Sequence, residues 1–379
     1  MTERAGFGLY VHWPFCQAKC PYCDFNSHVV SGVDQQRWAS ALTSEIRRYA
    51  DETGPRVLDS IFFGGGTPSL MTPETVATVI DTARASWLSS NDLEITLEAN
   101  PTSVEASRFD GYARAGVNRV SIGVQALNDP DLKALGRLHS ASEAKVAVDI
   151  AKKTFPRVSF DLIYARQNQS LSDWESELEE ALEMAADHLS LYQLTIEDGT
   201  AFGDRMARGR LRGLPNDDLA ADMFELTQAM TADAGLAAYE ISNHAKPGAA
   251  SRHNLIYWHG GDWVGVGPGA HGRLTLDDRR TATEAHSAPG KWLDAVESAR
   301  NGESLRSVLP KKDAAQERVM MGLRLVEGIE PSVLSAAEIS RQSLQKLIDI
   351  SVLEELDGRV AATATGRAVL NAILRELLT

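Results

Sequence analysis

The run Phe15-Cys16-Gln17-Ala18-Lys19-Cys20-Pro21-Tyr22-Cys23-Asp24-Phe25 contains all three cysteines of the 379-residue chain. Iron–sulfur clusters normally take four thiolates. This segment can hold three corners of such a cluster, and the chain has no sulfur ligand for the fourth. One iron would therefore be left open to bind a small molecule.

The spacing CxxxCxxC resembles the signature of radical SAM proteins. We therefore expect a [4Fe-4S] cluster on Cys16, Cys20 and Cys23, with S-adenosyl-L-methionine (SAM) at the open iron. Two alternatives stay open: a zinc site completed by His12 or His28, and a redox pair formed by Cys20 and Cys23. Zinc ribbons usually bring two separated CxxC pairs, and a redox pair does not need Cys16. The cluster is therefore favoured.

Composition and charge restrict the class of protein and the partners. The chain is 43% hydrophobic and 24% charged, as in ordinary soluble domains. It has no run of about 18 apolar residues, so no membrane span is predicted. The start, Met1-Thr2-Glu3-Arg4-Ala5-Gly6, lacks the apolar core of a secretory signal, which predicts a cytoplasmic protein with reduced thiols. A net charge of −14 disfavours a nucleic-acid partner, including the alternative of a radical enzyme acting on RNA.

Alternating strand and helix patterns predict an α/β fold over residues 1–245, a partial (β/α) barrel around a parallel sheet. The expected strands are rich in β-branched and other apolar residues: Gly8–His12, Ser60–Phe63, Glu94–Glu98, Arg119–Val124, Val158–Ile163, Leu189–Leu194 and Ala238–Ile241. The expected helices are amphipathic: Gln35–Ala50, Pro73–Trp87, Val104–Ala115, Ser142–Lys153, Leu171–Ala186 and Asp217–Ala234.

The remaining sequence predicts two further parts. Residues 246–304 begin with a segment rich in Gly and His, which we expect to be dominated by loops as far as about residue 275. Residues 305–379 predict a small, mainly helical, winged-helix-like domain, with helices at 313–326, at 338–350 and from 365. A wing can contact DNA, but Glu354, Glu355 and Asp357 precede this one. A packing or interaction domain is therefore favoured.

Unusual residues follow several predicted strands, at the edge where barrel enzymes place their active sites. The glycines of Gly64-Gly65-Gly66-Thr67-Pro68 let backbone approach a ligand, and we expect them to hold the amino-acid end of SAM. Glu98 could pair with the SAM ammonium, and Asp161 could accept from its ribose hydroxyls. Capping or ion-pair roles are the alternatives for both carboxylates.

Several of these runs together resemble one family, the oxygen-independent coproporphyrinogen dehydrogenases and their heme-chaperone relatives. They are residues 10–16 leading into CxxxCxxC, GGGTP at 64–68, LEANP at 97–101, SIGVQ at 121–125 and DLIY at 161–164. The resemblance covers nearly the whole chain. It implies a radical SAM barrel with the cluster on the three cysteines. It also implies SAM contacts from Tyr10, the Tyr22 backbone, Gly65, Gly66, Thr67, Glu98, Gln125, Arg137 and Asp161.

Three features favour the chaperone branch of this family over the dehydrogenase branch. Phe25 stands where dehydrogenases have a further cysteine, and their longer segment before the first strand is missing. The chaperone branch also has an HNxxYW element, found here as His253-Asn254-Leu255-Ile256-Tyr257-Trp258. The resemblance implies that His253 is an axial ligand of heme. His244, His259 and His271 are candidates for a second ligand.

The expected function is a heme chaperone that passes heme to an acceptor protein, for which a respiratory membrane subunit is one candidate. Oxidative decarboxylation of coproporphyrinogen III is the alternative, and a homodimer is among the assemblies that the sequence allows. One departure from the family pattern follows DLIY. A glycine-proline turn is usual there, whereas this chain has Ala165-Arg166-Gln167-Asn168-Gln169. We therefore expect a differently shaped loop near Asp161.

Overall fold

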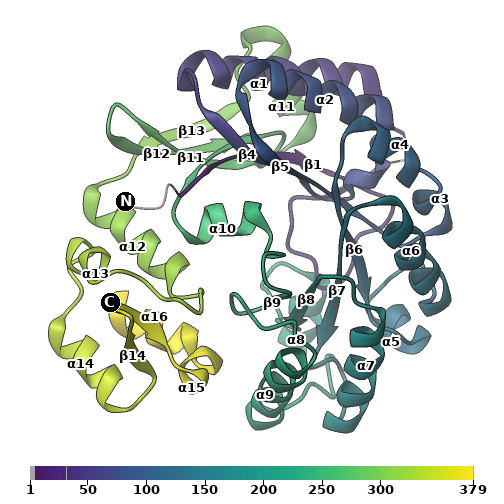
Figure 1. Cartoon of the computed structure of the whole chain (residues 1–379). Helices are drawn as coiled ribbons and strands as arrows, with labels where there is room; N and C mark the ends of the chain where they lie inside the picture. Colours follow the sequence, from purple (N-terminus) through teal and green to yellow (C-terminus); the bar gives the residue numbers. More distant parts are fainter. Residues whose placement is uncertain (1–4, 31, 379) are drawn as a thin grey trace.

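The structure is a computed structural model that describes residues 5–30 and 32–378. Residues 1–4, on which part of the localisation prediction depends, lie outside the described residues. An 11-stranded sheet runs in the order β13-β12-β11-β10-β1-β4-β5-β6-β7-β8-β9 (Figure 1). Its parallel centre has seven strands: β10 Asp262–Val266, β1 Phe7–Trp13, β4 Val57–Gly65, β5 Leu88–Ala99, β6 Arg119–Gln125, β7 Arg157–Tyr164 and β8 His188–Gln193. The predicted α/β fold with a parallel sheet is confirmed.

Helices connect these strands and cover the outer side of the curved sheet (Figure 1). The outer helices are α1 Gln35–Thr53, α2 Pro73–Ser86, α4 Phe109–Ala115, α6 Ala141–Thr154, α7 Leu171–Met184 and α9 Asp217–Asp233, and the short helices are α3 Ser103–Ala106, α5 Asp129–Ala134 and α8 Ala201–Ala207, of which α8 lies beside the cysteine loop. Two of them begin with reciprocal capping boxes, Ser140 with Glu143 in α6 and Ser170 with Asp173 in α7. Such caps satisfy backbone N–H groups that the first turn leaves free.

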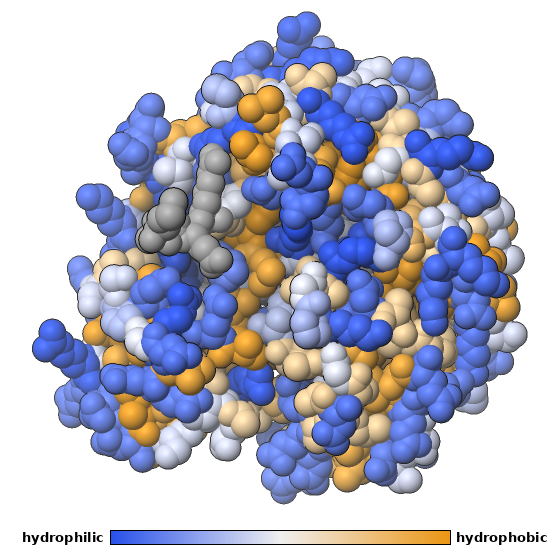
Figure 2. Space-filling model, viewed as in Figure 1, coloured by the Kyte–Doolittle hydropathy of each residue, from blue (hydrophilic) through white to orange (hydrophobic). Residues whose placement is uncertain are grey.

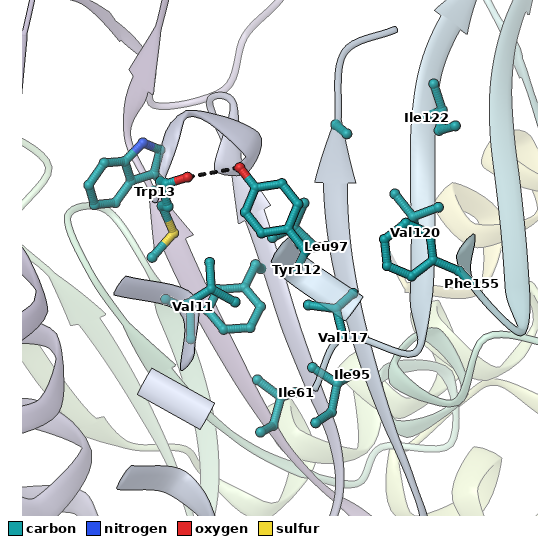
Figure 3. Close-up of a cluster of buried hydrophobic side chains, with 14 of the residues drawn as sticks. Val11, Trp13, Ile61, Ile95, Leu97, Tyr112, Val117, Val120, Ile122 and Phe155 are labelled. Atoms are coloured by element: carbon teal, nitrogen blue, oxygen red, sulfur yellow. Dashed lines mark hydrogen bonds between the residues drawn. The ribbon is translucent and has the colours of Figure 1, made fainter. Parts of the chain in front are cut away.

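The main core lies between the sheet and these outer helices (Figure 3). Val11, Ile61, Leu97, Val120 and Ile122 come from four successive strands, and each is fully buried. Burial of one such side chain is worth about 1.5–3 kcal/mol. Because alternate strand residues point to opposite faces, the intervening positions face the inside of the barrel. The polar residues of the functional site lie on that inner face.

The segment predicted to be dominated by loops is instead mostly regular, so that prediction was wrong. It forms α10 Arg252–Trp258, β10 Asp262–Val266 and β11 His271–Leu276, followed by β12 Arg279–Ala285, α11 Pro289–Ala299 and β13 Glu303–Val308. β10 pairs in parallel with β1. A Cβ at Gly265 would collide with the His271 carbonyl. Gly265 therefore permits close backbone approach within a strand and does not mark a loop.

The predicted strand at residues 238–241 was also wrong. Only one isolated bridge, between Ala238 and His244, forms there. The strand that closes the sheet is β9 Asn243–Ala245, antiparallel to β8. The Glu240 side chain accepts from the Ser242 backbone and the Asn243 side chain, which holds the chain in a turn where a strand was expected.

The C-terminal part forms a second, smaller core of its own. It contains α12 Lys311–Gly322, α13 Pro331–Ala336, α14 Arg341–Asp349, the hairpin β14 Leu353–Leu356 with β15 Arg359–Ala362, α15 Ala364–Ala368 and α16 Leu370–Leu378. This arrangement of helices and one hairpin agrees with the predicted winged-helix-like module. The domain boundaries at residues 245 and 304 stay a prediction.

The face seen in Figure 2 is covered mostly by hydrophilic residues, with hydrophobic residues scattered between them. Over residues 5–30 and 32–378, no helix has both the length and the apolar character that a membrane crossing requires.

Candidate functional site

The three cysteines meet at one pocket at the carboxyl ends of the parallel strands. β2 Phe15–Cys16 pairs with β3 His28–Val29, and this pairing closes the cysteine segment into a loop. Within the loop, the Cys23 N–H donates to the Cys20 carbonyl at 3.2 Å. All three thiols are free, and they border a cavity of about 170 Å³.

Eleven of the residues predicted to bind the cluster or SAM line this same pocket: Cys16, Cys20, Tyr22, Cys23, Gly65, Gly66, Thr67, Glu98, Gln125, Arg137 and Asp161. They come from five successive strand ends or from the loops that follow them. The structure therefore brings together the groups that the resemblance implies. Tyr10 and His253 are not in the lining, and they pack against each other with ring centroids 6.2 Å apart.

Each thiol faces a hydrogen-bond donor. The Thr67 hydroxyl lies 3.5 Å from the Cys16 sulfur, and Arg137 Nη1 lies 3.4 Å from the Cys20 sulfur. Cys23 receives the backbone N–H of Phe25. Burial raises the pKa of Cys16 and of Cys23, and these donors oppose that effect. Donors aimed at the sulfurs suit thiolates that hold an iron–sulfur cluster, whose potential depends on such hydrogen bonds.

The zinc alternative finds little support in the histidines it would need. His12 is buried, with Nδ1 at 3.0 Å from the Tyr10 hydroxyl and Nε2 at 2.9 Å from the Asn26 carbonyl. His28 Nε2 lies 3.2 Å from Asn26 Oδ1. Within the part of the chain that the structure describes, no group of three His, Cys, Asp or Glu is arranged around a single metal ion. A cluster, by contrast, binds its thiolates on separate irons.

The glycine loop lies directly against the cysteine loop. The Gly66 N–H donates to the Trp13 carbonyl at 2.7 Å, and the Thr67 N–H to the Phe15 carbonyl at 2.8 Å. Gly65 has φ +108°, a conformation that other residues rarely adopt. Across the pocket, Gln125 also has positive φ, at 72°. Strain of this kind in a non-glycine residue is typical of binding sites.

Replacing Gly66 by alanine is expected to damage the cluster site by a steric clash. The new Cβ would lie 2.8 Å from the Phe15 carbonyl oxygen and 3.0 Å from its backbone N, so the strand that carries Cys16 must shift. Overpacking of this kind costs about 1–3 kcal/mol. We expect a lower melting temperature and less iron per chain after anaerobic reconstitution. Gly32→Ala is the control, because its Cβ would meet nothing within 4 Å. Full iron loading by Gly66→Ala would contradict the prediction.

Two carboxyl groups lie on the floor of the pocket. Glu98 accepts from the Gly65 backbone, and burial together with the nearby Asp161 raises its pKa to about 8. Asp161 accepts from the Ser121 hydroxyl at 3.2 Å, and burial raises its pKa to about 6. At pH 7 the Glu98 carboxyl is therefore mostly neutral, whereas Asp161 is mostly ionised, and a bound cation would favour the carboxylate form of both. The ammonium and sulfonium of SAM would supply such positive charge.

An ion-pair cluster supports the loop after β7, where the sequence departs from the family pattern. Ala165 and Asn168 adopt positive φ, of 56° and 60°. Buried Arg166 pairs with Asp131 at 2.7 Å and with Glu177 at 2.6 Å. These contacts tie the loop to α5 and α7. They leave Asp161 in its place in the pocket lining.

His253 lies in a different environment from the one that its implied role needs. Its Nδ1 is 2.8 Å from the Ser60 hydroxyl and its Nε2 is 2.9 Å from the Tyr257 hydroxyl. The ring stacks on Phe62, with centroids 4.9 Å apart, and burial lowers its pKa to about 3. The imidazole is therefore neutral and buried, with both nitrogens already engaged. An axial role stays a prediction, and it requires at least one of these hydrogen bonds to break.

The three candidates for a second heme ligand differ in whether their ring nitrogens already have a partner. His259 Nε2 contacts Glu327 at 2.9 Å, and the exposed His271 lies 3.9 Å from Glu284. His244 is fully buried, and within the described residues neither of its ring nitrogens has a hydrogen-bond partner.

Three polar residues that contribute to the site were not predicted from the sequence. Asn100 and His139 line the pocket, and buried Glu105 holds Asn100. Asn100 stands two positions after Glu98 in the quoted run LEANP, so its place at the strand end was a usable signal. Glu105 and His139 lie in or beside helices, where their sequence context gives no such signal.

Comparison with known proteins identifies two parts of the chain. Residues 10–181 match the radical SAM superfamily, and residues 309–369 match the HemN C-terminal domain. The solved structure titled coproporphyrinogen III oxidase (HemN) from Escherichia coli superposes with a TM-score of 0.80. It covers 98% of this chain and 90% of that chain at 20% identity, which shows a shared fold.

Relatives with more similar sequences cover most or all of the chain. The mitochondrial radical S-adenosyl methionine domain-containing protein 1 of Mus musculus is 41% identical over 326 residues, 85% of this chain and 74% of that protein. The Escherichia coli K12 protein named heme chaperone HemW is 38% identical over 389 residues, with all of both chains covered. Its Haemophilus influenzae namesake is 37% identical, again over all of both chains. The chain therefore belongs to the radical SAM family that includes the proteins named heme chaperone HemW.

Proposed function

We propose that this protein is a heme chaperone that binds a [4Fe-4S] cluster, SAM and heme and transfers heme to an acceptor protein. The observation that carries the proposal is the identity of 37–38% over the full length of two proteins named heme chaperone HemW. Membership of the radical SAM family implies the cluster and SAM, and the eleven predicted residues around one pocket fit both. When bound, the cluster would supply a redox centre. The redox state of that centre can depend on whether SAM is bound to its open iron.

The proposed heme site is the HNxxYW element on α10. Aromatic rings surround His253 there: Tyr10, Phe62 and Tyr257 have centroids 6.2, 4.9 and 4.7 Å away. Such rings can cover a porphyrin face. Both imidazole nitrogens, however, are hydrogen-bonded, one to Ser60 and the other to Tyr257. Heme ligation through either nitrogen must therefore displace one of these hydrogen bonds, worth about 0.5–1.5 kcal/mol.

Heme titration under argon tests this proposal. Wild type is expected to bind heme with a ligand-shifted absorption spectrum, and His253→Ala is expected to lose that spectrum. Tyr257→Phe removes one competing hydrogen bond and keeps the ring, so it is expected to bind heme about threefold to tenfold more tightly. An unchanged spectrum and affinity in His253→Ala would exclude the axial role. His244→Ala, measured in parallel, tests the second ligand.

The same protein preparation distinguishes the proposed chaperone function from the alternative, oxidative decarboxylation of coproporphyrinogen III. Supplied with reductant, SAM and coproporphyrinogen III, a chaperone is expected to form no protoporphyrinogen at catalytic rates. Transfer of bound heme to an apo-acceptor, followed by its spectrum, is the positive result. Catalytic formation of protoporphyrinogen without heme transfer would overturn the proposal. A cytoplasmic location and a respiratory membrane subunit as acceptor belong to the same proposal.

A further inference from the structure

Two of the three cysteine thiols connect to a single side chain, that of Asn100. Arg137 contacts the Cys20 sulfur through Nη1 and donates from Nη2 to Asn100 Oδ1 at 2.5 Å. Thr67, the donor to the Cys16 sulfur, receives a hydrogen bond from Asn100 Nδ2 at 3.3 Å. Asn100 lines the same pocket as the cysteines. It therefore lies one hydrogen bond behind each of two cluster ligands.

The neighbours of Asn100 fix which way its amide points. Arg137 can only donate, so the amide oxygen must face it. On the other side, the Glu105 carboxylate accepts from the Asn100 backbone N–H at 2.9 Å and from Nδ2 at 3.4 Å. Glu105 is fully buried and also accepts from the Ser69 hydroxyl. The amide cannot turn over without placing acceptor against acceptor and donor against donor.

This orientation determines where the hydroxyl hydrogen of Thr67 goes. The side-chain Nδ2–H of Asn100 donates to the Thr67 hydroxyl oxygen. The hydroxyl has one hydrogen of its own. That hydrogen is thus free to point at the Cys16 sulfur, 3.5 Å away. Hydrogen bonds to cluster sulfurs raise the reduction potential, and groups behind the direct ligands set their orientation.

We propose that Asn100, held by Glu105, is a positioning residue that commits the Thr67 hydroxyl to Cys16 and thereby raises the reduction potential of the cluster. The inference depends on the cluster and not on heme. Its failure therefore leaves the chaperone proposal untouched, and loss of heme binding would leave this inference standing.

A charge-neutral exchange tests the inference: Asn100→Asp combined with Glu105→Gln. The new carboxylate still accepts from Arg137, but it now also accepts from the Thr67 hydroxyl, which turns away from Cys16. We expect the midpoint potential, measured by anaerobic redox titration with electron paramagnetic resonance, to shift to more negative values. Iron and sulfide content show that the titrated protein carries its cluster. Thr67→Val is expected to give a shift in the same direction, and Thr67→Ser to keep the wild-type potential.

The decisive comparison is the exchange made in the Thr67→Val background. Because both changes remove the same hydrogen bond, the exchange is expected to add little further shift there. A full, additive shift, or no shift from either change alone, would overturn the proposal. If the exchanged protein does not take up a cluster, Asn100→Ala serves in its place. Its potential is expected between those of wild type and Thr67→Val, and a wild-type value would again contradict the inference.

Discussion

Cys20→Ser is expected to abolish the [4Fe-4S] cluster while leaving the fold intact. The chain has three cysteines, and all three border one pocket, so a lost thiolate has no replacement among them. Cys20 is only half-buried and lies outside the hydrophobic cores, so its replacement creates no core cavity. Iron and sulfide content, the visible absorption of the reconstituted protein and its paramagnetic resonance with SAM should all be lost together.

The control for this variant is Asp24→Asn, a change at an exposed residue in the same loop that does not line the pocket. It is expected to load iron and respond to SAM as wild type does. The melting temperature of the cluster-free Cys20→Ser protein should match that of cluster-free wild type. A Cys20→Ser protein that retains four irons, or a wild type that holds a single zinc, would contradict the assignment of the site.

SAM binding to the cluster-loaded protein is expected to strengthen as pH rises from 6 to 8. In the free protein the Glu98 pKa is raised to about 8, so its carboxyl is mostly protonated at pH 7. The SAM ammonium favours the carboxylate and lowers that pKa in the complex. Binding therefore releases a proton below pH 8, and affinity rises by about tenfold per pH unit until the free carboxyl ionises. Asp161, with its pKa raised to about 6, adds to this dependence toward the acid end.

Glu98→Gln should remove both the charge pair and the pH dependence between 6 and 8. Loss of one partner of a buried charge pair costs about 2–5 kcal/mol, which is roughly 30-fold or more in affinity. Calorimetry under argon, in two buffers with different ionisation enthalpies, measures affinity and proton release together. Wild-type affinity that does not change between pH 6 and 8 would show that Glu98 is already ionised before SAM arrives.

The sequence predicted the barrel and the cluster pocket because both follow from local patterns. Alternating strands and helices specify a parallel sheet, and the carboxyl ends of parallel strands meet at one edge. Residues as far apart as Cys16, Glu98 and Asp161 could therefore be placed together. The chain has three cysteines, so the sequence offers no other thiols for the predicted cluster.

The failures arose where long-range pairing overrides local composition. The glycines at 260–272 indicated a loop, but Gly265 permits the close pairing of β10 with its neighbours. The axial role of His253 comes from resemblance alone and stays a prediction, and no sequence pattern shows that Ser60, almost 200 positions earlier, binds its ring. Glu105 was missed for the same reason, because its partner Ser69 lies on another element. Contacts of this kind depend on the completed fold.

The cysteine loop is held by the backbone pairing of β2 with β3 and by main-chain hydrogen bonds to the glycine loop beside it. We therefore expect the folded polypeptide to keep all three thiols around the same cavity after oxidation destroys the iron–sulfur cluster. Damage by air would then be reversible, because the iron–sulfur assembly machinery of the cell could insert a new cluster into the folded polypeptide.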